Sequence, residues 1–203
     1  MKIGIVNDSI GNVGSVLSAF QFYNYDVSLI EKPDELDNKD VIVLAGVGNF
    51  STATKKLKTT KFWDKLNHLV IDKKKPLIGI CLGMQIFADI GYEDGINKGF
   101  GWIKGKVIKL AGNNITIPHI GWSKVNFTNK QLTKNMKYQY FYYMHSYHFV
   151  PEDKNIIVAT TNYGDLKIVA AIKKDNIIGV QFHPEKSQGD GLRFLKNAVK
   201  LLT

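Results

Sequence analysis

The sequence predicts an α/β protein built on a three-layer, doubly wound, mostly parallel sheet, with added antiparallel strands in the second half. Two observations predict this fold. Apolar, β-branched runs alternate with helical spacing through the first half of the chain. From Phe100 onward, short strand-like runs follow one another instead. No repeat, low-complexity tract or linker divides the chain, so we expect a single domain over residues 1–203.

The first half supplies the parallel strands and their helices. Each expected strand is a short apolar run, and residues 40–45 (DVIVLA) are typical of a central parallel strand. The expected strands are residues 2–7, 26–30, 40–45 and 76–81. Helical spacing is carried first by Val13, Val16, Leu17 and Phe20, and then, in a lysine-rich region, by Leu57, Phe62, Leu66 and Leu69.

The second half supplies the antiparallel additions. Strands are expected at residues 102–110, 139–147, 155–162, 167–174 and 176–183. A helix over residues 192–201 closes the chain.

Composition excludes several classes of protein. The 44% hydrophobic and 22% charged content is that of an ordinary globular protein. No apolar run approaches the roughly 20 residues that span a bilayer, and the first residues turn polar too early for a secretory signal. A single cysteine excludes an internal disulfide, so we expect a cytoplasmic protein. The net charge of +9 is spread over many lysines without a nucleic-acid-binding motif, so neither nucleic acid nor membrane is an expected partner.

The lone cysteine lies in Gly79-Ile80-Cys81-Leu82-Gly83, between an apolar run and a helical stretch. Strand, Gly-x-Cys-x-Gly and helix form the nucleophile-elbow pattern with cysteine in place of serine. The sharp turn requires small residues two positions away, and a helix N-terminus favours the thiolate. The Leu82 N–H could then donate to an oxyanion. The pattern alone fits a buried structural thiol equally well.

A cysteine nucleophile needs a base, and five histidines are available. His183 ends an apolar strand and is followed by Pro184 and Glu185, which places a base and a carboxylate at the edge where doubly wound folds assemble their sites. We therefore expect a triad of Cys81, His183 and Glu185. The other histidines are expected on a solvent-facing helix (His68), in a loop (His119) and in an aromatic strand with core or interface roles (His145 and His148).

Two of these segments resemble the motifs of the class I, triad-type glutamine amidotransferases: GICLGMQ (79–85) and GVQFHPEKS (179–187). Further segments are similar to one branch of that family, the glutaminase subunits of imidazole glycerol phosphate synthases. They are DSIGN (8–12), LAGVGNF (44–50), PHIGW (118–122) and YMHSYH (143–148). The resemblance runs from residue 3 nearly to the end, and it implies the flavodoxin-like form of the α/β fold.

The resemblance implies a reaction and its residues. Cys81 attacks the side-chain amide of glutamine, His183 shuttles the proton, and Glu185 holds His183. The oxyanion hole would use N–H groups of Leu82 and of the loop that contains Val47 and Gly48. Four further positions match residues that hold glutamine: Gln85, Glu93, Ser146 and Tyr147. Neither a metal nor a cofactor takes part in the implied chemistry.

The resemblance also implies a heterodimer with a (β/α)8-barrel cyclase subunit. That partner would use the ammonia to form imidazole glycerol phosphate and an aminoimidazole carboxamide ribotide (AICAR) in histidine biosynthesis. Positions that match the partner face and channel gate are Asn12, Trp122, Tyr142 and Lys186. Without the resemblance, Trp122 fits a packing anchor and Lys186 a solvated charge equally well. Glutaminases of this branch are typically quiet without the partner's substrate, and glycines flanking Val47 would permit a switching peptide flip.

Three positions depart from the branch pattern: Ala45 replaces a proline, Ser9 an aromatic residue, and Ser123 an asparagine. They leave open a paralogous glutaminase that serves a cyclase-like partner in surface-glycan biosynthesis. A non-catalytic scaffold subunit is a further alternative, although the intact triad argues against it. A standalone cysteine hydrolase or peptidase would leave the partner-face matches unexplained.

Overall fold

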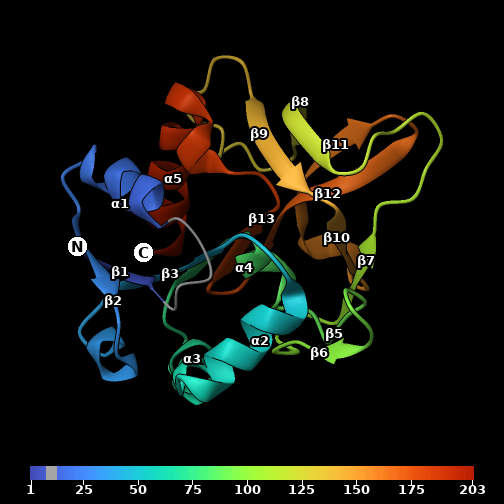
Figure 1. Ribbon diagram of the computed structural model, residues 1–203. Helices are drawn as coiled ribbons and strands as arrows, with labels where there is room; N and C mark the ends of the chain where they lie inside the picture. The colour runs from blue at the N-terminus through green and yellow to red at the C-terminus, as the bar shows by residue number, and fades with distance from the viewer. Residues whose placement is uncertain (8–12) are drawn as a thin grey trace.

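A nine-stranded mixed sheet forms the centre of the part of the chain that the structure describes, residues 1–7 and 13–203 (Figure 1). In this computed structural model the strand order is β2-β1-β3-β4-β13-β12-β11-β8-β9. Neighbours from β2 to β13 pair in parallel. Those from β13 to β9 pair antiparallel. The predicted α/β fold, with antiparallel strands added late in the chain, is confirmed.

The sheet's two halves come from different parts of the chain. The parallel half consists of β1 (Lys2–Val6), β2 (Asp26–Ile30), β3 (Val41–Gly46), β4 (Leu77–Cys81) and β13 (Ile177–Val180). The antiparallel half consists of β8 (His119–Phe127), β9 (Tyr140–His145), β11 (Ile157–Tyr163) and β12 (Leu166–Lys174). Because β3, β4 and β13 are covered on both faces, they are almost uniformly apolar.

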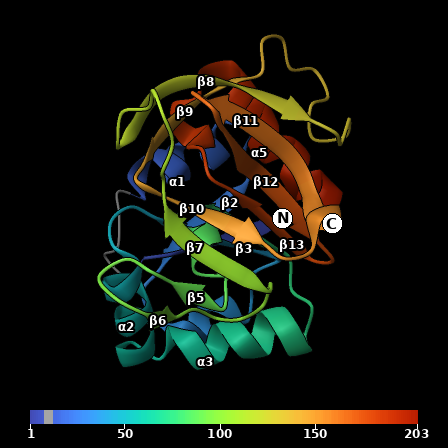
Figure 2. The same ribbon diagram turned by 90° about the vertical axis from the view of Figure 1, so that its right-hand side faces the viewer.

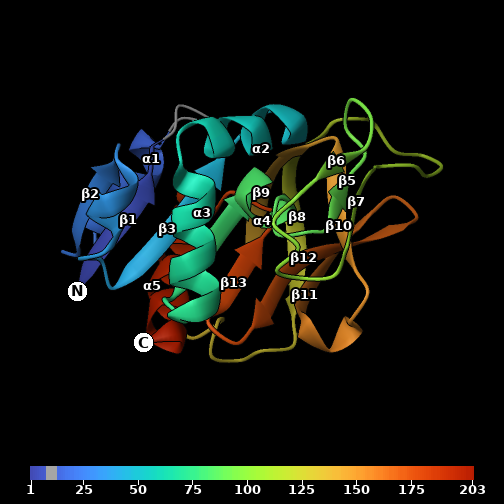
Figure 3. The same ribbon diagram turned by 90° about the horizontal axis from the view of Figure 1, so that it is seen from below.

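Helices cover both faces of the parallel strands (Figures 1 and 3). On one side, α1 (Gly14–Gln21) and α5 (Gln188–Leu202) bury Phe20 and Phe194 against the sheet. On the other side lie α2 (Phe50–Thr59), α3 (Phe62–Asn67) and a π-helical turn (His68–Asp72). The predicted core residues Leu57, Phe62, Leu66 and Leu69 are all buried there. No helix of the described residues has both the length and the apolar character that crossing a membrane requires.

A smaller sheet has the order β10-β7-β5-β6 and is seen in front in Figure 2. Its strands are β10 (Tyr147–Pro151), β7 (Gly105–Lys109), β5 (Ile90–Gly91) and β6 (Asn97–Lys98). The strand expected over residues 102–110 is therefore shorter than predicted.

Two sequence-based expectations are wrong in this region. Residues 139–147 are not one strand: β9 ends at His145, and Tyr147 begins β10, where it pairs with Lys109 of the smaller sheet. His119 does not lie in a loop but opens β8 and is buried. Along β8 every second residue is exposed, but the exposed positions include Ile120 and Trp122 and the less exposed ones include Gly121 and Ser123. The sequence therefore does not show the apolar–polar alternation that identifies a strand.

Candidate active site

Cys81 is the last residue of β4 and forms a strained turn into the short helix α4 (Leu82–Gln85). Its backbone has φ 53° and ψ −109°, a conformation that L residues adopt only under strain. A side chain at Gly83 would overlap the carbonyl oxygen of Leu44, and one at Gly79 would overlap the ring of Phe87. The flanking glycines therefore permit the close packing that holds this turn.

The parallel pairing of β4 with β13 brings His183 to the cysteine. Ile80 lies opposite Val180, so both strands end at the same edge of the sheet. His183 and Glu185 follow β13, and Nδ1 of His183 lies 2.8 Å from Oε1 of Glu185. Both side chains are almost fully buried. Nε2 of His183 is buried without a hydrogen-bond partner among the described residues.

Burial alone would lower the pKa of His183, but the neighbouring charges outweigh it. The Cys81 sulfur and the Glu185 carboxylate raise the pKa of His183 to about 10. The charged imidazolium form of His183 is therefore favoured at neutral pH. A histidine must be in this form to make an ion pair with a thiolate. This arrangement can support nucleophilic attack by sulfur and proton transfer by the imidazole.

Strand β9 fixes the backbone of the histidine segment. The N–H of His183 donates to the carbonyl of Tyr142 at 2.8 Å. The hydroxyl of Ser187 donates to the carbonyl of His183 at 2.6 Å and accepts from the N–H of Tyr142 at 2.9 Å. Tyr142 is thus hydrogen-bonded to the base segment through both of its backbone groups.

A cavity of about 400 Å³ opens beside Cys81. All the residues predicted for the oxyanion hole and for glutamine binding line it: Val47, Gly48, Leu82, Gln85, Glu93, Ser146 and Tyr147. Asn49, Pro118, Met144 and His145 also line it and carried no predicted role there. Its volume and its few polar groups suit a small ligand.

The segment predicted to form the oxyanion hole is held at its far end by a hydrogen bond to Glu93. Leu82 begins α4, so its N–H has no helical carbonyl to bind. Gly48 has φ +111°, which favours glycine. The N–H of Phe50 donates to Oε2 of Glu93 at 2.7 Å. Burial raises the pKa of Glu93, and this hydrogen bond opposes the rise.

Three of the four residues predicted to form the partner face, Trp122, Tyr142 and Lys186, are among the described residues and lie close together. The rings of Trp122 and Tyr142 meet edge to face at 6.1 Å, and Nζ of Lys186 lies 5.9 Å from the Tyr142 ring. Trp122 is 47% exposed, as a docking surface requires. Asn12 and Ser9 lie outside the described residues.

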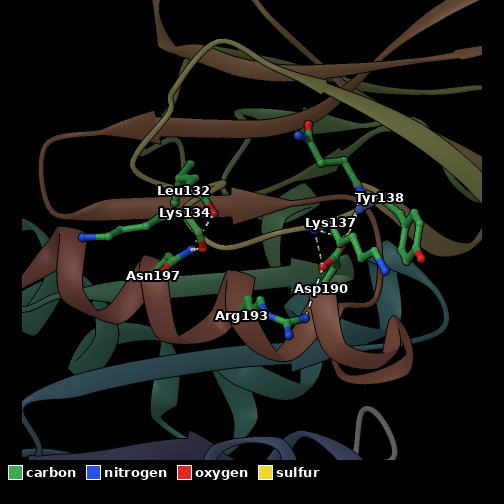
Figure 4. A network of polar contacts seen from close by, with 8 residues as sticks. Leu132, Lys134, Lys137, Tyr138, Asp190, Arg193 and Asn197 are labelled. Carbon is green, nitrogen blue, oxygen red and sulfur yellow. Dashed lines mark hydrogen bonds and ion pairs between the residues drawn. The ribbon is translucent and has the colours of Figure 1, made fainter.

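Helix α5 anchors the long loop that leads into this surface (Figure 4). Oδ2 of Asp190 accepts the N–H groups of Tyr138 and Gln139 at 2.7 and 2.8 Å, and Oδ1 accepts that of Lys137 at 3.0 Å. Burial would raise the pKa of Asp190, but these three donors outweigh it and lower the pKa. The loop before β9 is thereby fixed to the helix that follows the triad.

Two of the three residues that depart from the branch pattern, Ala45 and Ser123, are among the described residues, and both lie close to the site. Ala45 lines a small void together with His183 and Glu185. The hydroxyl of Ser123 lies 2.9 Å from Nε2 of His119.

Comparison with known proteins decides the family. The family model described as glutamine amidotransferase class-I matches residues 6–201. The chain belongs to the class I glutamine amidotransferases. The resemblance noted in the sequence is therefore confirmed, and the chain is a glutamine amidotransferase by family.

Similar amidotransferases include proteins named imidazole glycerol phosphate synthase subunit HisH. Those of Pelagibacter ubique and Sulfolobus acidocaldarius are each 40% identical to this chain; they cover 99% and 100% of it, and 100% and 99% of their own lengths. That of Pyrococcus furiosus is 41% identical over 98% of this chain and 99% of its own.

Solved structures support the fold at lower identity. A glutamine amidotransferase has a TM-score of 0.78 at 14% identity, with 98% of each chain covered. The PurLQS structure from Thermotoga maritima has a TM-score of 0.74 at 17% identity, and the match covers all of this chain and 99% of that one.

Proposed function

We propose that this protein is the glutaminase subunit of an imidazole glycerol phosphate synthase. It hydrolyses glutamine to glutamate and ammonia and passes the ammonia to a (β/α)8-barrel cyclase subunit. One observation carries the proposal: a single cavity joins Cys81 to the predicted oxyanion and glutamine-binding residues, with His183 and Glu185 behind the sulfur. Similarity of about 40% to HisH relatives along the whole chain supports this branch of the family.

The reaction begins with the Cys81 thiolate attacking the side-chain carbonyl carbon of glutamine. The oxyanion that forms accepts hydrogen bonds from the N–H of Leu82 and an N–H of the Val47–Gly48 segment. The imidazolium of His183 protonates the amide nitrogen, the C–N bond breaks, and ammonia leaves a thioester on Cys81. Neutral His183 then takes a proton from water, which attacks the thioester and releases glutamate and the thiolate.

The remaining cavity residues hold the amino-acid end of the substrate. The Glu93 carboxylate is the acceptor for the α-ammonium, and the Ser146–Tyr147 backbone holds the α-carboxylate. Gln85 lies on the same wall as Cys81 and contacts Tyr147 through its amide. This binding positions the side-chain amide at the sulfur.

The product ammonia needs a partner, because in water it would be protonated. Trp122, Tyr142 and Lys186 form the face and gate to the barrel subunit, a role that the sequence resemblance also implies for Asn12. Both proteins act in the cytoplasm as a heterodimer. The glutaminase is slow on its own, because the loop around Val47 and Gly48 turns its N–H toward the oxyanion only when the partner holds its substrate.

A paralogous role in surface-glycan biosynthesis is the second candidate. Ser123 favours it, because asparagine is expected after PHIGW in the histidine branch and the serine hydroxyl here bonds the buried His119. The chemistry of the cavity is the same in both cases, and only the partner and its acceptor differ.

The deciding experiment copurifies the protein with candidate barrel subunits and assays glutaminase activity with and without the ribulosyl phosphate acceptor. We expect a stable complex whose glutaminase activity rises at least about tenfold with the acceptor. Cys81→Ala must abolish glutamine-dependent synthesis and leave ammonia-dependent synthesis intact. Rapid glutamine hydrolysis without any partner would contradict the proposal, and activation only by a glycan-locus partner would establish the second candidate.

A further inference from the structure

One buried polar side chain beside Cys81, that of Gln181, has no part in the proposed reaction. Gln181 is fully buried between the end of β13 and His183. Its Nε2 lies 3.6 Å from the Cys81 sulfur, within the range of a hydrogen bond to sulfur. Polar groups are buried this completely when they have partners that compensate for the loss of water.

The orientation of the Gln181 amide follows from the backbone carbonyl of Tyr147, to which it is linked through the side chain of Gln85. The carbonyl oxygen of Tyr147 can only accept, so the group of Gln85 that lies 2.7 Å from it is the NH₂. That same NH₂ lies 3.1 Å from the Gln181 side chain, whose nearer atom must therefore be the oxygen. Gln181 is left with its own NH₂ toward the sulfur.

A buried histidine, His145, binds the same carbonyl, and a second, His119, orients His145. Nδ1 of His145 lies 2.9 Å from the Tyr147 oxygen and must donate to it. Nε2 of His145 then accepts from Nδ1 of His119 at 3.1 Å, and Nε2 of His119 accepts the Ser123 hydroxyl. Burial lowers the pKa of both histidines, to about 4 for His119 and about 3 for His145. Neutral imidazoles with fixed tautomers result, and the second lone pair of the Tyr147 oxygen is occupied.

We propose that Gln181 is a positioning residue for the nucleophile. Its NH₂ donates to Cys81 and favours the sulfur in its anionic form, because an anion is a stronger acceptor than a thiol. The Tyr147 carbonyl, held by Gln85 and by the His119–His145 pair, keeps the Gln181 amide from turning over. A flipped amide would present its oxygen to the sulfur.

The same carbonyl belongs to the segment that the proposed function assigns to the α-carboxylate of glutamine. Substrate binding at Ser146–Tyr147 would therefore act directly on the network that holds the nucleophile. This last step rests on the proposed function, whereas the contact between Gln181 and the sulfur does not.

The test measures alkylation of Cys81 by iodoacetamide as a function of pH, with neither glutamine nor partner present. Because the chain has one cysteine, the label reports on this residue alone. Gln181→Glu keeps the shape and replaces the donor with an acceptor. We expect its alkylation rate near neutral pH to fall at least about tenfold and its midpoint to move to higher pH. Gln181→Met, which removes the donor without adding charge, should show a smaller shift in the same direction.

Other ionisable groups around the sulfur stay constant in this comparison. They are His183 with Glu185 behind Cys81, and Glu93 and His145 across the cavity. Asn176→Asp is the matched control: it makes the same change just before β13, at the opposite end from Cys81, where the Asn176 amide donates to the carbonyls of Val70 and Lys75. It should lower stability and leave the alkylation profile unchanged.

The outcomes separate this inference from the proposed function. If both Gln181 variants remain folded and keep the wild-type alkylation profile, Gln181 only fills space and the inference fails. If the control shifts the profile as much as Gln181→Glu does, the effect is one of stability and the inference also fails. A shifted profile in a protein without partner-dependent glutaminase activity would overturn the proposed function alone.

Discussion

Gly83 is the residue on which the nucleophile turn depends most directly. A Cβ at this position would overlap the backbone carbonyl of Leu44, and backbone atoms of two packed elements cannot move aside cheaply. We expect Gly83→Ala to lower the free energy of unfolding by at least about 3 kcal/mol, measured by urea denaturation. Because the turn must shift, glutaminase activity should be lost in any folded fraction.

Gly189 provides the matched comparison. A Cβ there approaches the guanidinium of Arg193 at 2.8 Å, the far end of a flexible side chain. Gly189→Ala lies in the first turn of α5 and should change the stability by less than about 1 kcal/mol in either direction. Equal losses for both variants would mean that the turn at Cys81 has no special requirement for glycine.

The His183–Glu185 pair makes stability depend on pH. Although burial opposes the rise, the Cys81 sulfur and then the Glu185 carboxylate raise the folded-state pKa of His183 from 6.5 to about 10, so the folded protein holds this proton more tightly than the unfolded chain. This stabilisation is complete below the unfolded pKa and is lost as the pH rises toward 10. We therefore expect Glu185→Gln to cost more stability at about pH 6 than at about pH 10, measured by urea unfolding at both values. Glu152→Gln, at an exposed site, is the control. A loss of stability that is equal at both pH values in Glu185→Gln, or the same pH dependence in Glu152→Gln, would contradict the raised pKa of His183.

Residue-level chemistry could be predicted only where the sequence itself carries the pattern. Cys81 and its glycines are neighbours in sequence, and His183 and Glu185 end one apolar strand. Their roles stay predictions, but their proximity could be expected from strand ends alone. Gln181 could not be found in this way, because a single glutamine carries no sequence pattern and the direction of its amide depends on Tyr147.

At the scale of elements, Asp190 joins α5 to the loop before β9. Its carboxylate accepts three backbone N–H groups, whereas the amide of Asp190→Asn retains only one acceptor oxygen. We expect Asp190→Asn to cost about 1–3 kcal/mol of stability and to speed hydrogen exchange at the amides of Tyr138 and Gln139. Since the pKa of Asp190 is lowered, its contribution is present at neutral pH and is lost on acidification below the ordinary carboxyl pKa.

Asn197 holds the middle of the same loop and serves as the control (Figure 4). Its amide donates to the carbonyls of Leu132 and Lys134 at 3.0 and 2.9 Å. Asn197→Ala should loosen the loop near residue 134 without speeding exchange at Gln139. Faster exchange at Gln139 in both variants would mean that the loop opens as a unit and that Asp190 has no local role.

The elements that the sequence predicted well are those buried on both faces. Residues 40–45 and 76–81 read as apolar runs because helices cover both sides of β3 and β4. Strand β8 was missed because its exposed face carries Ile120 and Trp122 and its other face carries Gly121 and Ser123, so apolar and polar residues do not alternate in the sequence. The division of residues 139–147 at Ser146 was missed because both halves are strand; only pairing with β7 shows that the chain changes sheet there.

At the scale of the whole molecule, Cys81 and His183 lie at one edge of the sheet, where the parallel strands end, and the starts of these strands form the opposite edge. Cys81 ends β4 and His183 follows β13, and the two strands end side by side. Trp122 lies next to this region, because it pairs with Tyr142, which in turn pairs with His183. Helix α1 connects the end of β1 to the start of β2, and these strands are parallel. Phe22, just after α1, therefore lies toward the edge where the strands start, opposite Cys81. Phe22 is 65% exposed and Trp122 47%, so exposure alone does not distinguish the two aromatic residues.

Their positions in the fold predict opposite effects on partner binding. If the barrel subunit covers the edge from which ammonia leaves, Trp122 is buried in the complex, and truncating a buried interface tryptophan costs about 2 kcal/mol or more. We therefore expect Trp122→Ala to weaken the complex at least about thirtyfold by calorimetric titration and to reduce partner-dependent glutaminase activity. Phe22→Ala should leave both unchanged, because its ring lies at the edge that ammonia does not cross. A complex weakened by Phe22→Ala and not by Trp122→Ala would place the partner on the wrong side of the sheet for ammonia transfer.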